Sequence, residues 1–169
     1  MSEFTRMVEL RSIDARTRHV EAGEDERKAL AARFGLVTIG RLEADLELVA
    51  EGTTVTAKGT LSADIVQSCA VTGDDLPVAI REKLDLRFVP EAEQQAAVDE
   101  DREIDSSEAD EIGYEGTAFD LGEAIAESLA LAIDPYATGP GADAARKEAG
   151  LLGEEDTGPF AALKGLVKE

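Results

Sequence analysis

The chain has 169 residues, enough for one domain with a hydrophobic core, and its 37 acidic and 17 basic side chains give a net charge of −20. A field of this sign repels phosphate backbones, so it excludes nonspecific nucleic-acid binding by the whole surface and favours basic partners. The single cysteine excludes an intrachain disulfide, and because we find neither an apolar run of about 18 residues nor a signal sequence, we expect a cytoplasmic protein that crosses no membrane.

The N-terminal part predicts a strand followed by a helix. Residues 3–13 carry irregularly spaced apolar side chains, which we interpret as a first strand. Residues 22–34 are expected to form a helix, because acidic residues occupy its first turn, basic residues follow, and Gly35 is suited to end it. Six basic residues of this region are candidate contacts for RNA phosphates: Arg11, Arg16, Arg18, Arg27, Lys28 and Arg33. The alternative is that they are ordinary exposed residues.

The centre of the chain carries the clearest β pattern. Apolar and polar residues alternate over residues 41–48, 54–65 and 78–88, which predicts three strands with one face buried and one in water. Short turns at Glu51-Gly52 and at residues 72–75 join them into an antiparallel meander. Pro90 is expected to end the third strand because it has no amide hydrogen for the sheet.

The acidic segment that follows, residues 91–110, has almost no large apolar side chain and predicts a mobile loop. Its centre offers five candidate contacts for a basic protein: Asp99, Glu100, Asp101, Glu103 and Asp105. A calcium-binding loop is superficially matched by the spacing of Asp99, Asp101, Glu103, Asp105 and Asp110. Ile104 stands where the sharp turn of such a loop needs glycine, so we expect no metal site. The competing interpretation is that the run only keeps the protein soluble.

The last part predicts a short return strand at residues 111–114 and a helix at residues 120–133 that is apolar on most sides and packs on the sheet. The expected fold is α+β: an antiparallel sheet or meander of four to six strands, open or barrel-like, with one N-terminal helix and one buried helix. We assign residues 1–136 to a single domain and residues 137–169 to a flexible tail, in which residues 159–168 have the spacing of a short amphipathic segment.

Catalytic apparatus is not visible in the sequence. His19 is the only histidine and has no nucleophile near it in the chain, so we interpret it as a surface residue. Cys69 has the parity of the buried positions of its strand, which favours a structural thiol over a reactive one. No glycine-rich phosphate loop occurs either. We therefore expect no cofactor, no metal and no enzymatic activity.

Several short motifs, in this order and spacing, resemble the YceD family of bacterial proteins over roughly residues 36–141. They are Cys69 with Ala70-Val71-Thr72, the run from Leu84 to Glu91, Asp120-Leu121-Gly122-Glu123, Asp134-Pro135-Tyr136 and Gly139-Pro140-Gly141. The closing Pro159-Phe160-Ala161-Ala162-Leu163 also looks like the end of such proteins. One departure is Thr72, which stands where many members have a second cysteine, so a redox or metal role of that pair does not carry over.

The resemblance implies a non-enzymatic role in building the large ribosomal subunit, needed for accumulation of its RNA. In bacteria the family's gene commonly lies beside that of a small basic large-subunit ribosomal protein, which suits an acidic chaperone. The expected partner of this chain, a monomer, is therefore a basic large-subunit ribosomal protein, precursor large-subunit ribosomal RNA, or both. Two alternatives remain: a metal-dependent RNA-processing enzyme with carboxylates scattered in sequence, and a structural interaction module that docks through Phe160, Leu163 and Val167.

Overall fold

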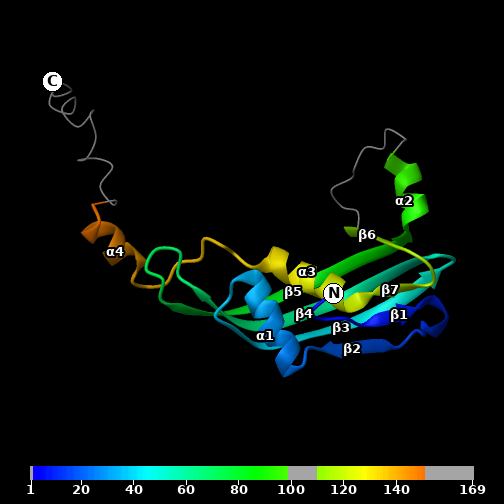
Figure 1. The fold of residues 1–169 in the computed structure, drawn as a ribbon, viewed down its shortest axis with the longest axis horizontal. Coiled ribbons are helices and arrows are strands. Elements are labelled where there is room, and N and C mark those ends of the chain that lie inside the picture. Colours follow the sequence, from blue (N-terminus) through cyan, green and yellow to red (C-terminus); the bar gives the residue numbers. More distant parts are fainter. Residues whose placement is uncertain (1, 99–109, 151–169) are drawn as a thin grey trace, which may run out of the picture.

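The computed structural model describes residues 2–98 and 110–150 (Figure 1). The strands are β1 (Met7–Glu9), β2 (Thr17–Glu21), β3 (Thr38–Glu51), β4 (Thr54–Ser68), β5 (Asp75–Pro90), β6 (Asp110–Tyr114) and β7 (Ala118–Asp120). The α-helices are α1 (Glu24–Phe34), α2 (Glu91–Val98), α3 (Leu121–Ala132) and α4 (Ala142–Glu148), and a short 3₁₀ helix, η1 (Leu10–Ser12), follows β1.

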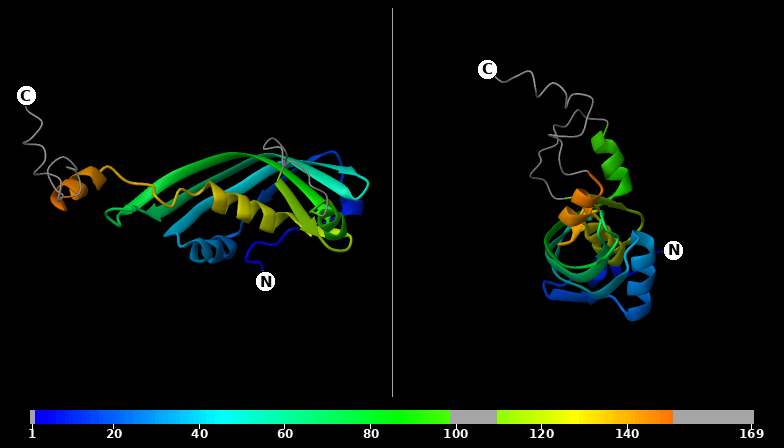
Figure 2. Two further views of the ribbon diagram at one scale, coloured as in Figure 1. Left: turned by 90° about the horizontal axis from the view of Figure 1, so that it is seen from above. Right: turned by 90° about the vertical axis from the view of Figure 1, so that its left-hand side faces the viewer.

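The main sheet has five strands in the order β2-β3-β4-β5-β6. The predicted antiparallel meander is confirmed for β3, β4 and β5, which are 14, 15 and 16 residues long. The sheet curls around α3 (Figure 2) but stays open, so the barrel-like alternative is wrong. A second correction concerns β6, the predicted return strand, which pairs with β5 in parallel.

The core lies between the inner face of the sheet and helices α1 and α3. The inward positions of β3 and β4 are almost fully buried and include Leu42, Leu46, Leu48, Leu61 and Ala63. Helix α3 adds Leu121, Ile125 and Leu129, each at most 1% exposed. Its remaining face is less apolar than predicted, because Leu131 points to the opposite side of the helix from Leu129 and is 83% exposed. The helix is therefore amphipathic rather than apolar on most sides.

The N-terminal region is more divided than its sequence suggested. Only residues 7–9 of the predicted strand over 3–13 form a strand, and β1 pairs with β7 in a separate two-stranded sheet. Strand β2, which was not predicted, pairs with β3 and buries a single side chain, Val20, too few for a visible alternation. Helix α1 is confirmed, and Gly35 ends it in the left-handed conformation with φ of 66°.

The acidic segment begins with a helix, so the prediction of a loop from residue 91 is wrong for residues 91–98. The physical reason is composition, because Glu, Ala and Gln are strong helix formers. A Cβ atom on Gly113 would lie 2.5 Å from Gln94 Oε1, so α2 lies close against β6. The five acidic residues from Asp99 to Asp105 and the segment 159–168 lie outside the described residues.

The predicted tail contains α4 in its described part, and Ala142 at the start of that helix is 2% exposed. Across residues 2–98 and 110–150, no helix is both long and apolar enough to cross a membrane.

Candidate protein-binding face

The outer face of the sheet is a polar surface that the described helices leave mostly uncovered. Along β3, β4 and β5 the side chains alternate between the core and this face, which we call the open face. Helices α1 and α3 pack on the inner side, and α2 borders the open face only at its β6 end, next to Gly113. The open face is therefore a long twisted surface with charged and hydroxyl side chains.

Acidic side chains are concentrated on the β2–β3 half of the open face. We call this group the acidic stripe: Glu21, Glu43, Asp45, Glu47 and Glu51. The strand register sets Glu21 opposite Glu43, so two like charges are adjacent across β2 and β3. One cation at the end of the stripe, Arg41, pairs with Glu43 at 2.5 Å and Asp64 at 2.8 Å.

The electrostatic effect of the stripe is visible at His19, whose Nδ1 lies 2.8 Å from Asp45 Oδ1. This hydrogen bond raises the pKa of His19, and the negative charges of Asp45, Glu43 and Glu21 raise it further. Neighbouring carboxylates therefore favour a positive charge on this half of the face, as they would for a cationic group of a partner.

The β4–β5 half of the open face has a different chemistry. Strand β4 presents hydroxyl groups, including Thr60 and Ser62, opposite Lys83 and Arg81 of β5. Two further cations on this half are paired: Lys58 with Asp85 at 3.1 Å, and Arg87 with Glu111 at 2.7 Å. The open face is thus acidic along β2 and β3 and of mixed charge along β5.

The six basic residues predicted to contact RNA lie on several N-terminal elements, and most are engaged within the chain. Arg33 binds Glu123 at 2.8 Å and Glu3 at 3.1 Å, and Lys28 binds Glu24 at 2.7 Å. The others lie as follows: Arg27 donates to the Ala22 carbonyl, Arg18 to the Ser12 carbonyl, Arg16 is 3.9 Å from Asp14, and Arg11 is exposed on η1. The structure therefore brings few of these six cations together, because they lie on separate elements and most contact other groups of the chain.

The motif Asp120-Leu121-Gly122-Glu123 at the start of α3 has structural contacts. Asp120 caps the helix by accepting hydrogen bonds from the Gly122 and Glu123 amides, and it also accepts one from the Arg6 amide at 2.8 Å. Leu121 is buried in the core. Glu123 pairs with Arg33, which lowers its pKa. This cluster fixes the N-terminal segment and α1 to α3.

The motif that follows α3, Asp134-Pro135-Tyr136, lies against the turn between β4 and β5. Buried Gln67 donates from Nε2 to the Asp134 carbonyl at 2.7 Å, and the Ala70 amide donates to Ala137. Asp134 Oδ1 also accepts from the Tyr136 amide across Pro135, which forms a turn that leaves the Tyr136 side chain 81% exposed. These contacts fasten the chain after α3 to the turn.

Cys69 is the centre of this turn and is buried, as predicted, with 4% of its surface exposed. Its Sγ accepts hydrogen bonds from the Gly139 amide at 3.3 Å and the Thr72 amide at 3.5 Å. These N–H donors, with the Thr72 side chain, lower the pKa of the thiol to about 6. Thr72, which stands where the resemblance implies a second cysteine, thus supports the sulfur of Cys69.

The lowered pKa of Cys69 predicts a pH-dependent contribution to stability. A thiol with a folded pKa of about 6 and an unfolded value of about 8.5 binds more protons in the unfolded state between these limits. The contribution of Cys69 to the free energy of unfolding should therefore rise with pH from about 6 to about 8.5 and be lost as the pH falls through 6. His19, whose pKa is raised, acts in the opposite direction, so the measurement is urea unfolding of the wild type and of Cys69→Ala at several pH values, and the difference between the two proteins should follow this rise.

The acidic stripe was not among the predicted site residues. A signal was present, because Glu43, Asp45 and Glu47 occupy the water-facing positions of a clearly alternating strand. Alternation alone does not distinguish a solvated face from a binding face. The predicted contacts for a basic partner were therefore placed in the denser acidic run after residue 98. The structure adds that β2 brings Glu21 beside Glu43.

Comparison with known proteins agrees with the motifs described above. The family model of the large ribosomal RNA subunit accumulation protein YceD matches residues 57–167, more than half of the chain. No curated protein and no solved structure matches the chain significantly. The matched region runs from β4 through α3 and α4 and includes the Cys69 turn and the Asp120 cap. The chain therefore belongs to the YceD family.

Proposed function

We propose that this protein is a non-enzymatic assembly factor of the large ribosomal subunit that binds a basic ribosomal protein through its acidic stripe. The family name links the chain to accumulation of large-subunit ribosomal RNA. The observation that carries the proposal is the position of the stripe: five carboxylates on two adjacent strands, on a face that the described helices leave open.

Charge and shape both support a protein partner. A basic segment of a ribosomal protein carries many positive charges, and an acidic surface can hold such a segment by long-range attraction. The stripe extends along β3, where alternate residues are about 7 Å apart, so an extended peptide can contact successive carboxylates. Binding of this kind is rapid, sensitive to salt, and reversible when RNA competes for the same cations.

Direct RNA binding has less support. Most N-terminal cations are paired with carboxylates or carbonyls of the chain, and the net charge of −20 opposes a phosphate backbone. Binding through the partner would still bring the protein to precursor RNA, so RNA in an isolated complex must be separated from protein-mediated retention.

A tagged pull-down from cells at two salt concentrations, with and without nuclease, tests the proposal. We expect a basic large-subunit ribosomal protein to stay bound after nuclease treatment and to be released at the higher salt. If instead precursor RNA is retained and its digestion removes every ribosomal protein, the protein binds RNA directly and the proposal is wrong.

A further inference from the structure

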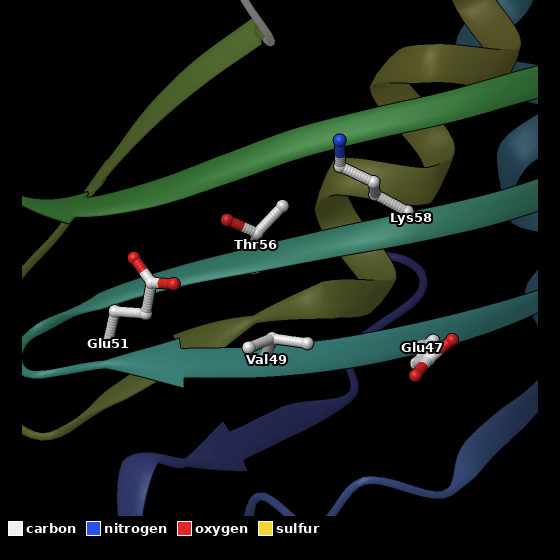
Figure 3. A pocket seen from close by; sticks show the side chains of 5 residues that line it. All are labelled: Glu47, Val49, Glu51, Thr56 and Lys58. Carbon is white, nitrogen blue, oxygen red and sulfur yellow. The ribbon is translucent and has the colours of Figure 1, made fainter.

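A hollow of about 390 Å³ lies on the open face near the turn that connects β3 and β4 (Figure 3). Its lining residues are Glu47, Val49 and Glu51 from β3 and Thr56 and Lys58 from β4. Val49 is an apolar side chain at a water-facing position, and it is 47% exposed. The register sets Thr56 opposite Val49, so a hydroxyl group lies across from the apolar floor.

The carboxylates of this hollow are available to a partner. Lys58 is opposite Glu47 in the register, but its Nζ pairs with Asp85 at 3.1 Å, and Figure 3 shows the side chain directed toward β5. Within residues 2–98 and 110–150, neither Glu47 nor Glu51 has an ion-pair partner. Each is two residues from Val49 on the same face, so the two negative charges flank the apolar floor.

An apolar floor between two unpaired carboxylates suits a side chain with an aliphatic stem and a cationic head. Arginine fits better than lysine, because its planar guanidinium has five N–H donors and can serve two carboxylates and a hydroxyl group together. We propose that the hollow binds an arginine side chain of an extended basic segment, with the stem on Val49 and the guanidinium between Glu47 and Glu51. This inference rests on the proposed function and names the side chain that anchors the partner.

The test uses a synthetic 12-residue peptide of alternating arginine and serine, with a lysine–serine peptide as its counterpart. Binding to the full chain is measured by fluorescence anisotropy at low salt. We expect the double variant Glu47→Gln with Glu51→Gln to bind the arginine peptide about tenfold more weakly than the wild type, because two exposed ion pairs are lost. The matched control is Glu82→Gln with Glu127→Gln, which makes the same change in net charge away from the stripe and should bind as the wild type does.

Two further measurements identify the hollow itself. Val49→Thr keeps the branched shape but makes the floor polar, and it should weaken the arginine peptide a few-fold with the fold intact by circular dichroism. The wild type should prefer arginine to lysine, and the Glu47/Glu51 double variant should lose this preference.

The outcomes separate the hollow from the proposed function. If Glu43→Gln with Asp45→Gln weakens binding as much as the Glu47/Glu51 variant, and Val49→Thr has no effect, the stripe acts as a diffuse charge and the hollow is not an arginine site. The proposed function survives that result. If the wild type binds neither the arginine peptide nor a ribosomal protein in the pull-down, the proposed function fails, and the hollow fails with it.

Discussion

Replacing Gly122 by alanine is expected to lower the free energy of unfolding by at least about 2 kcal/mol. A Cβ atom at this position would lie 2.4 Å from the Phe4 carbonyl oxygen and 2.8 Å from the Arg6 amide nitrogen. Both neighbours are backbone atoms, so the N-terminal segment must move. Phe4 is fully buried, and displacing its ring removes contacts that are worth about 3–5 kcal/mol when such a side chain is truncated.

Alanine would also gain about 1 kcal/mol of helix propensity over glycine, which offsets only part of that loss. Urea unfolding monitored by circular dichroism measures the difference. Gly40→Ala is the matched control, because its Cβ would meet only ordinary contact, 3.6 Å from the Asp64 carbonyl oxygen. A Gly122→Ala protein as stable as the wild type would show that the N-terminal segment is not held against α3 as described.

The central meander and helix α3 could be predicted because their patterns are long. Each of β3, β4 and β5 alternates over many residues, and the period of two leaves one consistent buried face. Helix α3 has a capping aspartate, Asp120, and a proline soon after its end, which mark its bounds in the sequence. Local chemistry therefore determines these elements.

The elements that sequence reasoning missed depend on contacts between distant residues. Strand β2 is defined by pairing with β3 rather than by its own pattern. Strand β6 was predicted, but its parallel pairing with β5 was not; the long connection that contains α2 permits this direction. The candidate site on the open face could not be predicted for the same reason, since it also depends on pairing between distant segments. His19 and Asp45 are 26 residues apart, and their contact follows only from the β2–β3 register.

Reversing two charges of the acidic stripe, Asp45→Lys with Glu47→Lys, is expected to weaken binding of the basic ribosomal partner on the order of a hundredfold at low salt. The change removes two attractive charges and adds two repulsive ones on the same face. Both side chains point into water, and Asp45 is 61% exposed at its side chain, so the fold should tolerate the substitutions. Affinity for the ribosomal protein recovered in the pull-down can be measured by titration calorimetry at several salt concentrations.

The decisive comparison is with Glu82→Lys and Glu127→Lys, which make the same four-unit change in net charge on other surfaces. If the stripe is the binding surface, this control should keep most of the affinity, and the dependence on salt should weaken only in the stripe variant. Equal losses in the two proteins would mean that the partner responds to the net charge of −20 and not to the arrangement on β2 and β3. In that case the open face would have no special role, because a nonspecific attraction needs no particular strand register.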